Sequence, residues 1–217
     1  MLIGKILWYS IFIPFIVGTR YYKRLQTSHK FLYAFVCSGV LTELTSRFIK
    51  KILDVKNNMP LGHAYITISF IFMALFYLHE LKGFVKEKLI IGIILVYTIF
   101  SIINVSFFQS YYSYPSITGA ISALLLVTFA IMLFTRIMIE AKIKTLSKSS
   151  LAWINSAVLI YYSGNFFFYI LFNIILSYSE KFTIKTLNFF SILYLIFYVF
   201  IAIGFWYASH IPNKNSK

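Results

Sequence analysis

FLYAFVCSGVLTELTSRFIKKIL, residues 31–53, is the segment on which the fold depends, because it is largely apolar yet carries Glu43, Arg47, Lys50 and Lys51. Each charged side chain is costly in the hydrocarbon core of a bilayer. Whether this segment crosses a membrane therefore decides how many spans the chain has. It also decides on which side of the membrane every later loop lies.

The composition of the chain is that of a membrane protein. Of its 217 residues, 60% are hydrophobic and only 12% are charged, against about 25% charged residues in a soluble domain. Apolar stretches long enough for the roughly 20 residues that a bilayer core requires recur along the chain. We expect an all-α, polytopic bundle of about seven transmembrane helices, forming a single integral membrane domain over residues 1–217. The predicted spans are residues 2–19, 31–53, 64–81, 89–109, 116–139, 150–177 and 187–208.

The distribution of basic residues favours a second segment that crosses. With seven spans, the loops on one side hold 13 Lys and Arg residues and those on the other side hold six; without the second span, the division is ten against ten. Positively charged loops stay in the cytoplasm, so seven spans predict the N-terminus outside and the C-terminus inside. The frequent Ile, Phe, Tyr, Lys and Asn have AT-rich codons, which indicates an AT-rich bacterial genome and a bacterial inner (cytoplasmic) membrane.

The net charge of +14 raises the question of nucleic-acid binding. The Lys and Arg residues stand at span boundaries instead of forming one patch, as juxtamembrane charges do. We therefore expect no direct binding of nucleic acid. The expected partners are membrane lipid and another protein, and a homo-oligomer is an open alternative.

Glu43 and Arg47 are the first candidate site. Their spacing of four places them on one helix face, with the acid N-terminal to the base, which is the favourable order. A charged pair inside a span is expected to face the bundle interior. Two interpretations stay open: the pair neutralises itself and fixes helix packing, or it takes part in transport, gating or proton movement.

The sixth predicted span carries a polar ladder. At 100° per residue, four of its members fall within about 40° of one another and the fifth lies further round the same side. The ladder consists of Asn155, Tyr162, Asn165, Tyr169 and Asn173, of which Asn165 is the outlying member. Hydrogen bonding between helices is one interpretation. The other is a wall of a polar cavity that has Glu43 and Arg47 on its opposing side.

His63, at the outer start of the third predicted span, is a candidate pH sensor because a histidine at a membrane surface titrates near neutral pH. The alternative is an interfacial residue with a water partner. Smaller polar signals are Asn104 in the fourth span and Ser191 and Tyr194 in the seventh.

No catalytic motif is complete in this sequence. His79 and Glu80 form an HE dipeptide, but no second histidine follows at the zincin spacing. There is one cysteine, and there is no glycine-rich phosphate loop or serine triad. We expect a protein that is not an enzyme and that uses no metal or cofactor.

One enzyme class does share a short motif with the chain. Glu43-Leu-Thr-Ser-Arg47 resembles the second half of the EExxxR motif of the membrane glutamic proteases of the prenyl-endopeptidase type, in which a glutamate activates water. Here Thr42 replaces the first glutamate, and the downstream histidine patterns of that class are missing.

Several longer stretches resemble a family of small seven-helix membrane proteins of flavobacteria and their Bacteroidetes relatives. They are Glu43 with Ser46-Arg47, NNMPLGHAY at 57–65, Phe108-Gln109 and WINSAVLIYYSGNFFF at 153–168. This resemblance implies the seven-helix fold and no particular chemistry. In size, predicted spans and inferred lineage the chain is also similar to the multi-pass membrane accessory proteins of type VI, RNA-targeting CRISPR loci, which implies modulation of an RNA-cleaving effector in antiviral defence.

We expect a non-enzymatic inner-membrane protein that acts through a partner as a modulator, sensor or membrane effector. Its short basic cytoplasmic loops suit docking of an acidic partner. The first alternative is a small-solute or proton-coupled transporter that uses Glu43 and Arg47. The second is an oligomeric membrane pore.

Overall fold

The computed structural model describes residues 8–55, 57–140 and 145–210. Within these ranges the chain forms seven α-helices and no β-strand, so the all-α prediction is confirmed. The helices are α2 (Phe12–Tyr21), α3 (Thr27–Ile52), α4 (Met59–Glu80), α5 (Glu87–Ile103), α6 (Ser116–Glu140), α7 (Ser150–Ser177) and α8 (Glu180–Ser209). Short helical turns accompany them: η1 (Trp8–Ile11), η2 (Tyr22–Arg24), the π-turn η3 (Asn104–Phe108) and η4 (Leu146–Lys148).

The helix starts follow from local sequence. Ser149 and Ser179 are the N-caps of α7 and α8, and each side chain accepts a hydrogen bond from a backbone N–H in the first turn. Pro14 and Pro60 lie in the first turns of α2 and α4, where a proline is tolerated because no amide hydrogen is needed. These signals move the starts of α4 and α8 several residues ahead of the predicted spans.

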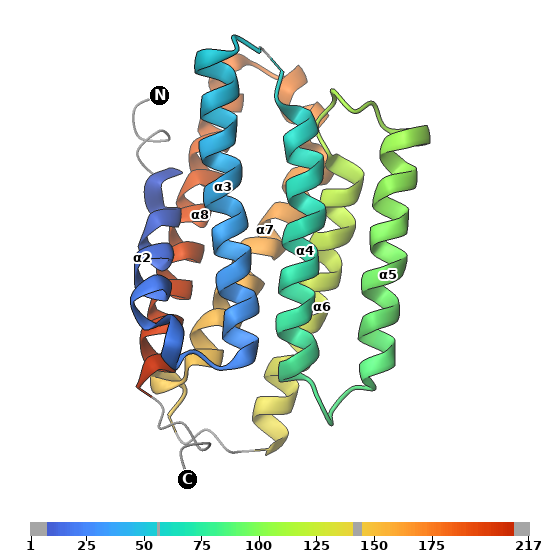
Figure 1. The fold of residues 1–217 in the computed structure, drawn as a ribbon. Helices are drawn as coiled ribbons and strands as arrows, with labels where there is room; N and C mark the ends of the chain where they lie inside the picture. The colour runs from blue at the N-terminus through green and yellow to red at the C-terminus, as the bar shows by residue number, and fades with distance from the viewer. Residues whose placement is uncertain (1–7, 56, 141–144, 211–217) are drawn as a thin grey trace.

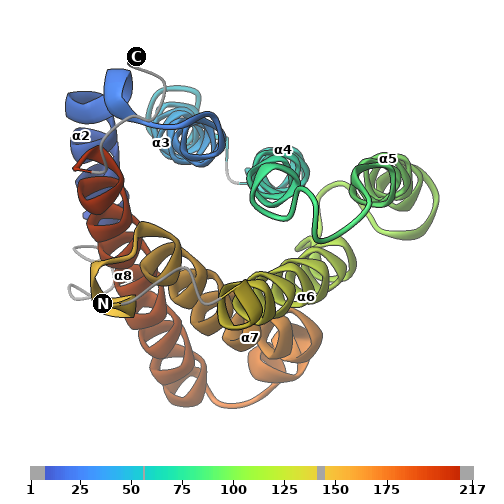
Figure 2. The ribbon, with the colours of Figure 1, turned by 90° about the horizontal axis from the view of Figure 1, so that it is seen from below.

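Successive helices run in opposite directions along a common axis (Figure 1). Viewed along that axis, α3 and α4 form one side of the bundle and α6, α7 and α8 the other, while α2 lies between α3 and α8 (Figure 2). α7 packs against both α6 and α8, and α4 packs against α3 and α6. α5 lies at the outer edge and packs mainly against α4.

Five helical segments in the described part of the chain are long and apolar enough to cross a membrane. They are Met59–Glu80, Glu87–Phe108, Ser116–Glu140, Ser150–Phe172 and Lys181–Ser209. α2 has only ten residues and α3 carries several charges in its second half. α3 nevertheless runs alongside α2 and α4 in the bundle (Figure 1). The full count of seven crossings and the orientation stay predictions.

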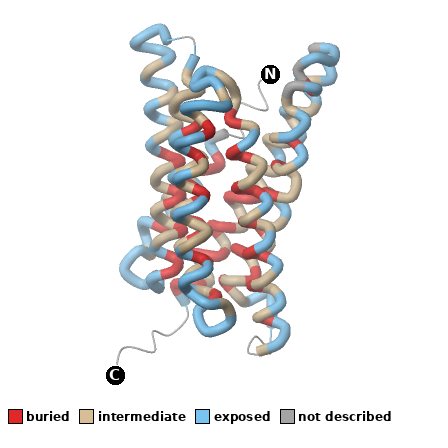
Figure 3. The backbone as a smooth tube through the Cα atoms, turned by 90° about the vertical axis from the view of Figure 1, so that its right-hand side faces the viewer, coloured by how far each residue is buried: buried red, intermediate tan, exposed pale blue. Residues whose placement is uncertain are grey.

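The core is rich in aromatic side chains. Fully buried rings come from four helices, α3, α4, α6 and α8, and they include Phe35, Phe70, Tyr77, Phe129 and Phe197. Figure 3 shows buried segments on the inward faces of the helices and exposed ones on the outer faces and at the ends. The exposed side chains include many large hydrophobic ones, as expected for helices that face lipid.

One end of the bundle is packed less tightly than the rest. The buried residues of α3 all lie between Ser28 and Val40, and the first buried side chain described in α8 is Phe197. The second half of α3 and the first half of α8 therefore face each other without close packing. The space between them leads into the cavity described next.

Candidate functional site: a cavity at one end of the bundle

A cavity of about 560 Å³ lies at the end of the bundle where α3 ends, α4 begins and α7 turns into α8. Its walls come from these four helices and from the segment that joins α5 to α6, which contributes Tyr114 and Pro115. Small-molecule sites typically have volumes of about 300 to 1,000 Å³. The cavity is therefore large enough to hold a small organic molecule.

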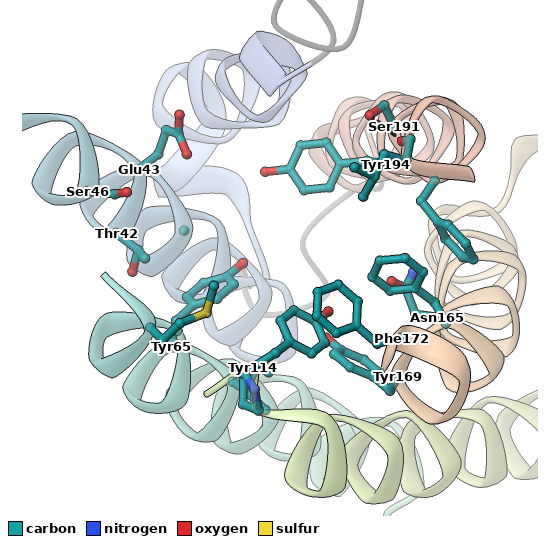
Figure 4. A pocket seen from close by; sticks show the side chains of 18 of the residues that line it. Thr42, Glu43, Ser46, Tyr65, Tyr114, Asn165, Tyr169, Phe172, Ser191 and Tyr194 are labelled. Carbon is teal, nitrogen blue, oxygen red and sulfur yellow. Dashed lines mark hydrogen bonds between the residues drawn. The ribbon is translucent and has the colours of Figure 1, made fainter. Parts of the chain in front are cut away.

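Polar groups gather on one side of the cavity. Figure 4 shows the Glu43 carboxylate of α3, the Tyr65 hydroxyl of α4 and the Tyr194 hydroxyl of α8 pointing into the same part of the space. Gly39 makes room for two neighbours, because a Cβ atom at this glycine would lie 2.6 Å from Ile11 Cδ1 and 3.1 Å from the Tyr65 hydroxyl oxygen.

Aromatic rings form the opposite wall. Tyr114 stacks on Phe172 with ring centroids 3.8 Å apart, and its ring also lies 5.7 Å from that of Tyr169. A side chain at Gly119 of α6 would overlap the Tyr169 ring, so this glycine lets the ring lie directly against α6. The wall is held by packing between three separate segments.

An ion pair orients Glu43. The Nε and Nη2 atoms of Arg47 both lie 2.7 Å from Oε1 of Glu43, and Nη1 donates a 2.6 Å hydrogen bond to the Tyr9 hydroxyl. The guanidinium also lies over the Tyr9 ring, 4.5 Å from its centroid. Arg47 thus holds one carboxylate oxygen and leaves Oε2 for a further donor.

The prediction that both charges face the bundle interior is wrong for Arg47. Its side chain is 43% exposed and lies beside η1, whereas the Glu43 side chain is 18% exposed and lines the cavity. Four residues advance a helix by about 400°, so the two positions differ by roughly 40° around the axis. The long arginine side chain also carries its charge outward, beyond the apolar surface.

The structure divides the predicted ladder of α7 between different environments. Asn165 and Tyr169 line the cavity, opposite Glu43 (Figure 4). Tyr162 lines a smaller void of about 30 Å³ beneath it. Asn155 lies deeper and joins three helices: it accepts a 2.8 Å hydrogen bond from the Tyr77 hydroxyl of α4 and donates one of 2.8 Å to the Ala130 carbonyl of α6. The side chain of Asn173 lies outside what the structure describes.

His63 is buried and has a protein partner; whether it senses pH or binds interfacial water stays a prediction. Its Nε2 lies 3.0 Å from the Ser113 carbonyl oxygen, and because a carbonyl only accepts, Nε2 is the donor. Its ring also stacks on Tyr111 with centroids 6.0 Å apart. His63 therefore fastens the segment between α5 and α6, which forms one edge of the cavity, to α4.

A second polar cluster lies at the other end of the bundle. His29 Nε2 lies 2.7 Å from the Ser150 hydroxyl, which donates a 2.8 Å hydrogen bond to the Gly204 carbonyl. Since the hydroxyl proton is used in that bond, His29 is the donor to Ser150. The cluster joins the start of α3, the start of α7 and the end of α8.

Sequence reasoning missed Tyr65, Tyr114 and His29. Tyr65 lies on α4 and Tyr114 lies between α5 and α6, whereas the predicted site residues came from the spacing of polar residues on α3 and α7. Their place in the cavity depends on which helices pack together. His29 precedes the predicted second span, so the sequence offers no intramembrane signal for it. Among the described residues, no three His, Cys, Asp or Glu side chains gather as a metal site requires.

No protein-family model matches the chain, and neither a curated protein nor a solved structure matches it. The resemblance to the flavobacterial seven-helix family and to the CRISPR accessory proteins therefore stays an expectation from sequence.

Proposed function

We propose that this chain is a non-enzymatic, multi-pass sensor of the bacterial inner membrane that binds a small molecule in the cavity and signals to a partner protein. The observation that carries the proposal is the cavity of about 560 Å³, with Glu43 on one wall and Asn165 and Tyr169 on the other. A ligand in this space contacts α3, α4, α7 and α8 at once. Its binding is therefore coupled to the relative positions of four helices.

The packing of α3 and α8 suggests how binding would be transmitted. The second half of α3 and the first half of α8, which are their cavity halves, have no buried side chains among those described. The other half of each helix is packed, and the two are linked through His29, Ser150 and Gly204. A ligand that binds better when the cavity halves approach each other shifts the population toward that arrangement. Because both helices run unbroken to the far end of the bundle, a tilt at the cavity also moves the far end.

The far end is where the predicted cytoplasmic loops present their basic residues. Lys23 and Arg24 precede α3, and Lys86 and Lys88 lie at the start of α5. A row of such charges favours an acidic protein surface as the docking partner. An accessory role beside an RNA-cleaving CRISPR effector is a proposal of the same kind, supported by chain size and predicted spans, and the neighbouring genes test it directly.

The proposal is tested with a matched pair of tryptophan variants. A Cβ at Gly62, which lines the cavity, would meet only the Pro115 ring at 3.9 Å, and a Cβ at Gly92 of α5 would meet nothing within 4 Å. Gly62→Trp therefore fills the cavity, whereas Gly92→Trp adds the same side chain elsewhere. The purified chain in lipid nanodiscs is heated with a panel of amphiphilic amines, alcohols and carboxylates.

A sensor requires two results from this panel. Ligands should raise the midpoint of thermal unfolding in the wild-type chain and in Gly92→Trp but not in Gly62→Trp. The same ligands should change backbone hydrogen exchange at residues 22–26, at the opposite end of α3. Identical behaviour of the two tryptophan variants, or binding without a change at residues 22–26, would contradict the proposal.

Transport is the second candidate function. The small void beneath the cavity shares Tyr65, Ile66, Tyr161 and Tyr169 with it, so lined space continues toward the middle of the bundle. A transporter that uses the charged pair predicts uptake into proteoliposomes that is abolished by Glu43→Gln and by Arg47→Ala. A sensor predicts binding without net uptake in the wild-type chain.

A further inference from the structure

We infer that the ligand of this cavity is an amphiphilic organic cation: a protonated amine that carries an apolar, preferably aromatic, body. The inference rests on the proposed function, because it names the ligand class of the same cavity. It follows from the charge of the lining, from the oxygen-bearing side chains near that charge and from the rings on the opposite wall.

The lining has a single sign of charge. Among the described residues that line the cavity, Glu43 is the only one with a formal charge, and the lysines at the end of α3 and the start of α8 do not line it. Arg47 lies on the outside of α3 and contacts Oε1. A ligand therefore meets a carboxylate that Arg47 holds through Oε1, and a cationic donor is the group that suits it.

Three oxygen-bearing side chains border the polar part of the cavity. The Glu43 carboxylate and the hydroxyl oxygens of Tyr65 and Tyr194 reach the same part of the cavity from three different helices (Figure 4). A primary ammonium group has three N–H donors and no acceptor. Such a group would pair with the Glu43 carboxylate of α3, and the two hydroxyl groups, which already have side-chain partners, add polar neighbours from α4 and α8.

The opposite wall suits an apolar body. Tyr114 and Phe172, which are stacked, lie beside Tyr169, and Phe168 contacts Phe190 with centroids 4.2 Å apart. Aromatic faces pack against flat apolar groups and attract cations. An anion of the same shape would meet the Glu43 carboxylate and the negative faces of the rings. The cavity therefore discriminates by the charge of the head group as well as by shape.

The test uses three probes that share one body and differ in the head group: naphthylethylamine, naphthylethanol and naphthylpropanoate. Binding to the full chain in nanodiscs of zwitterionic lipid is measured by equilibrium dialysis at neutral pH, where the amine is a cation and the propanoate an anion. A hydrogen bond to a charged group is stronger than one between neutral groups, so the amine should bind at least about tenfold more tightly than the alcohol. The propanoate should bind more weakly than either.

Variants of Glu43 assign the preference to its carboxylate. Glu43→Gln should bring the affinity for the amine down to that for the alcohol, with little change for the alcohol, and Glu43→Asp should keep a preference for the amine. Glu87 lies at the start of α5, near Lys82, and does not line the cavity. Glu87→Gln is therefore the matched control and should change none of the three affinities.

The possible results separate this inference from the proposal beneath it. If the three probes bind equally well to the wild-type chain and none binds to Gly62→Trp, the ligand need not be a cation. The inference is then overturned, while the cavity remains a ligand site. An unchanged preference for the amine in Glu43→Gln would also overturn the inference. If all three probes bind and Gly62→Trp reduces the binding of none of them, both the cation inference and the proposed ligand cavity are overturned.

Discussion

Glu43 and Arg47 show what a four-residue spacing predicts and what it leaves open. The spacing predicts the ion pair, and the structure contains it. It does not predict that one partner lines a cavity while the other stacks on Tyr9, because this depends on where η1 lies against α3. The same spacing is therefore compatible with a pair that only neutralises itself and with a carboxylate that binds a ligand. Only the tertiary contacts distinguish the two.

Asn155 carries a prediction on stability, because its amide is buried and bonded to two other helices. Asn155→Ala removes the acceptor of the Tyr77 hydroxyl and a second donor to the Ala130 carbonyl, and we expect a loss of about 2 kcal/mol in the free energy of unfolding. For a chain of this size that is a fall of about 6 °C in the unfolding midpoint. Circular dichroism during heating in detergent micelles measures it.

Tyr77→Phe provides the graded comparison, because it removes one hydrogen bond and keeps the ring in the core. It should cost about 1 kcal/mol. The exposed Tyr112 is the matched control, and Tyr112→Phe should leave the midpoint unchanged. An unchanged midpoint in Asn155→Ala would show that this amide does not join the helices.

Helices were the most predictable part of this fold. Apolar runs identify α4 to α8, because a buried or lipid-facing helix needs a continuous stretch of apolar residues. The helix ends differ from the predicted span ends where a capping residue sets the helix start. α8, for example, begins at Glu180 because Ser179 accepts a hydrogen bond from the Phe182 N–H. Which helix faces meet was not predictable, since nearly every face of such helices is apolar. The polar ladder on α7 thus predicted that Asn165 and Tyr169 line a cavity, but it did not indicate Tyr114, whose ring lies beside that of Tyr169.

Gly119 carries a prediction on how α6 meets the cavity. A methyl group at this position would overlap the Tyr169 ring. We expect Gly119→Ala to push this ring into the cavity, to cost about 1 to 3 kcal/mol of stability and to weaken binding of naphthylethylamine. Thermal unfolding and equilibrium dialysis measure the two effects.

Gly92→Ala is the control for this prediction, since a Cβ at Gly92 meets nothing within 4 Å. Alanine is the better helix former by about 1 kcal/mol, so this variant should be as stable as the wild-type chain or more stable. Equal stability and equal probe affinity of the two alanine variants would argue against close packing of Tyr169 on α6.

The arrangement of all the helices depends on α3, the helix with the charged second half. Its place beside α2 and α4 agrees with a crossing segment, and the larger number of basic residues on one side predicts the same. Single cysteines at Arg24 and Val55, before and after α3, test it in a Cys37→Ser background with an impermeant thiol reagent. We expect Val55→Cys to react in intact spheroplasts and Arg24→Cys to react only after lysis. Labelling of both from the same side would show that α3 does not cross.

The central claim is that the cavity, at the bundle end that the predicted orientation places outside, takes up a small molecule. The most direct measurement is the rate at which Gly62→Cys, as the only cysteine in the chain, reacts with an impermeant thiol reagent added outside spheroplasts. We predict labelling from outside that slows at least about threefold when naphthylethylamine is present at a concentration a few times its dissociation constant. Labelling only after lysis, or at the same rate with and without the amine, would contradict the claim.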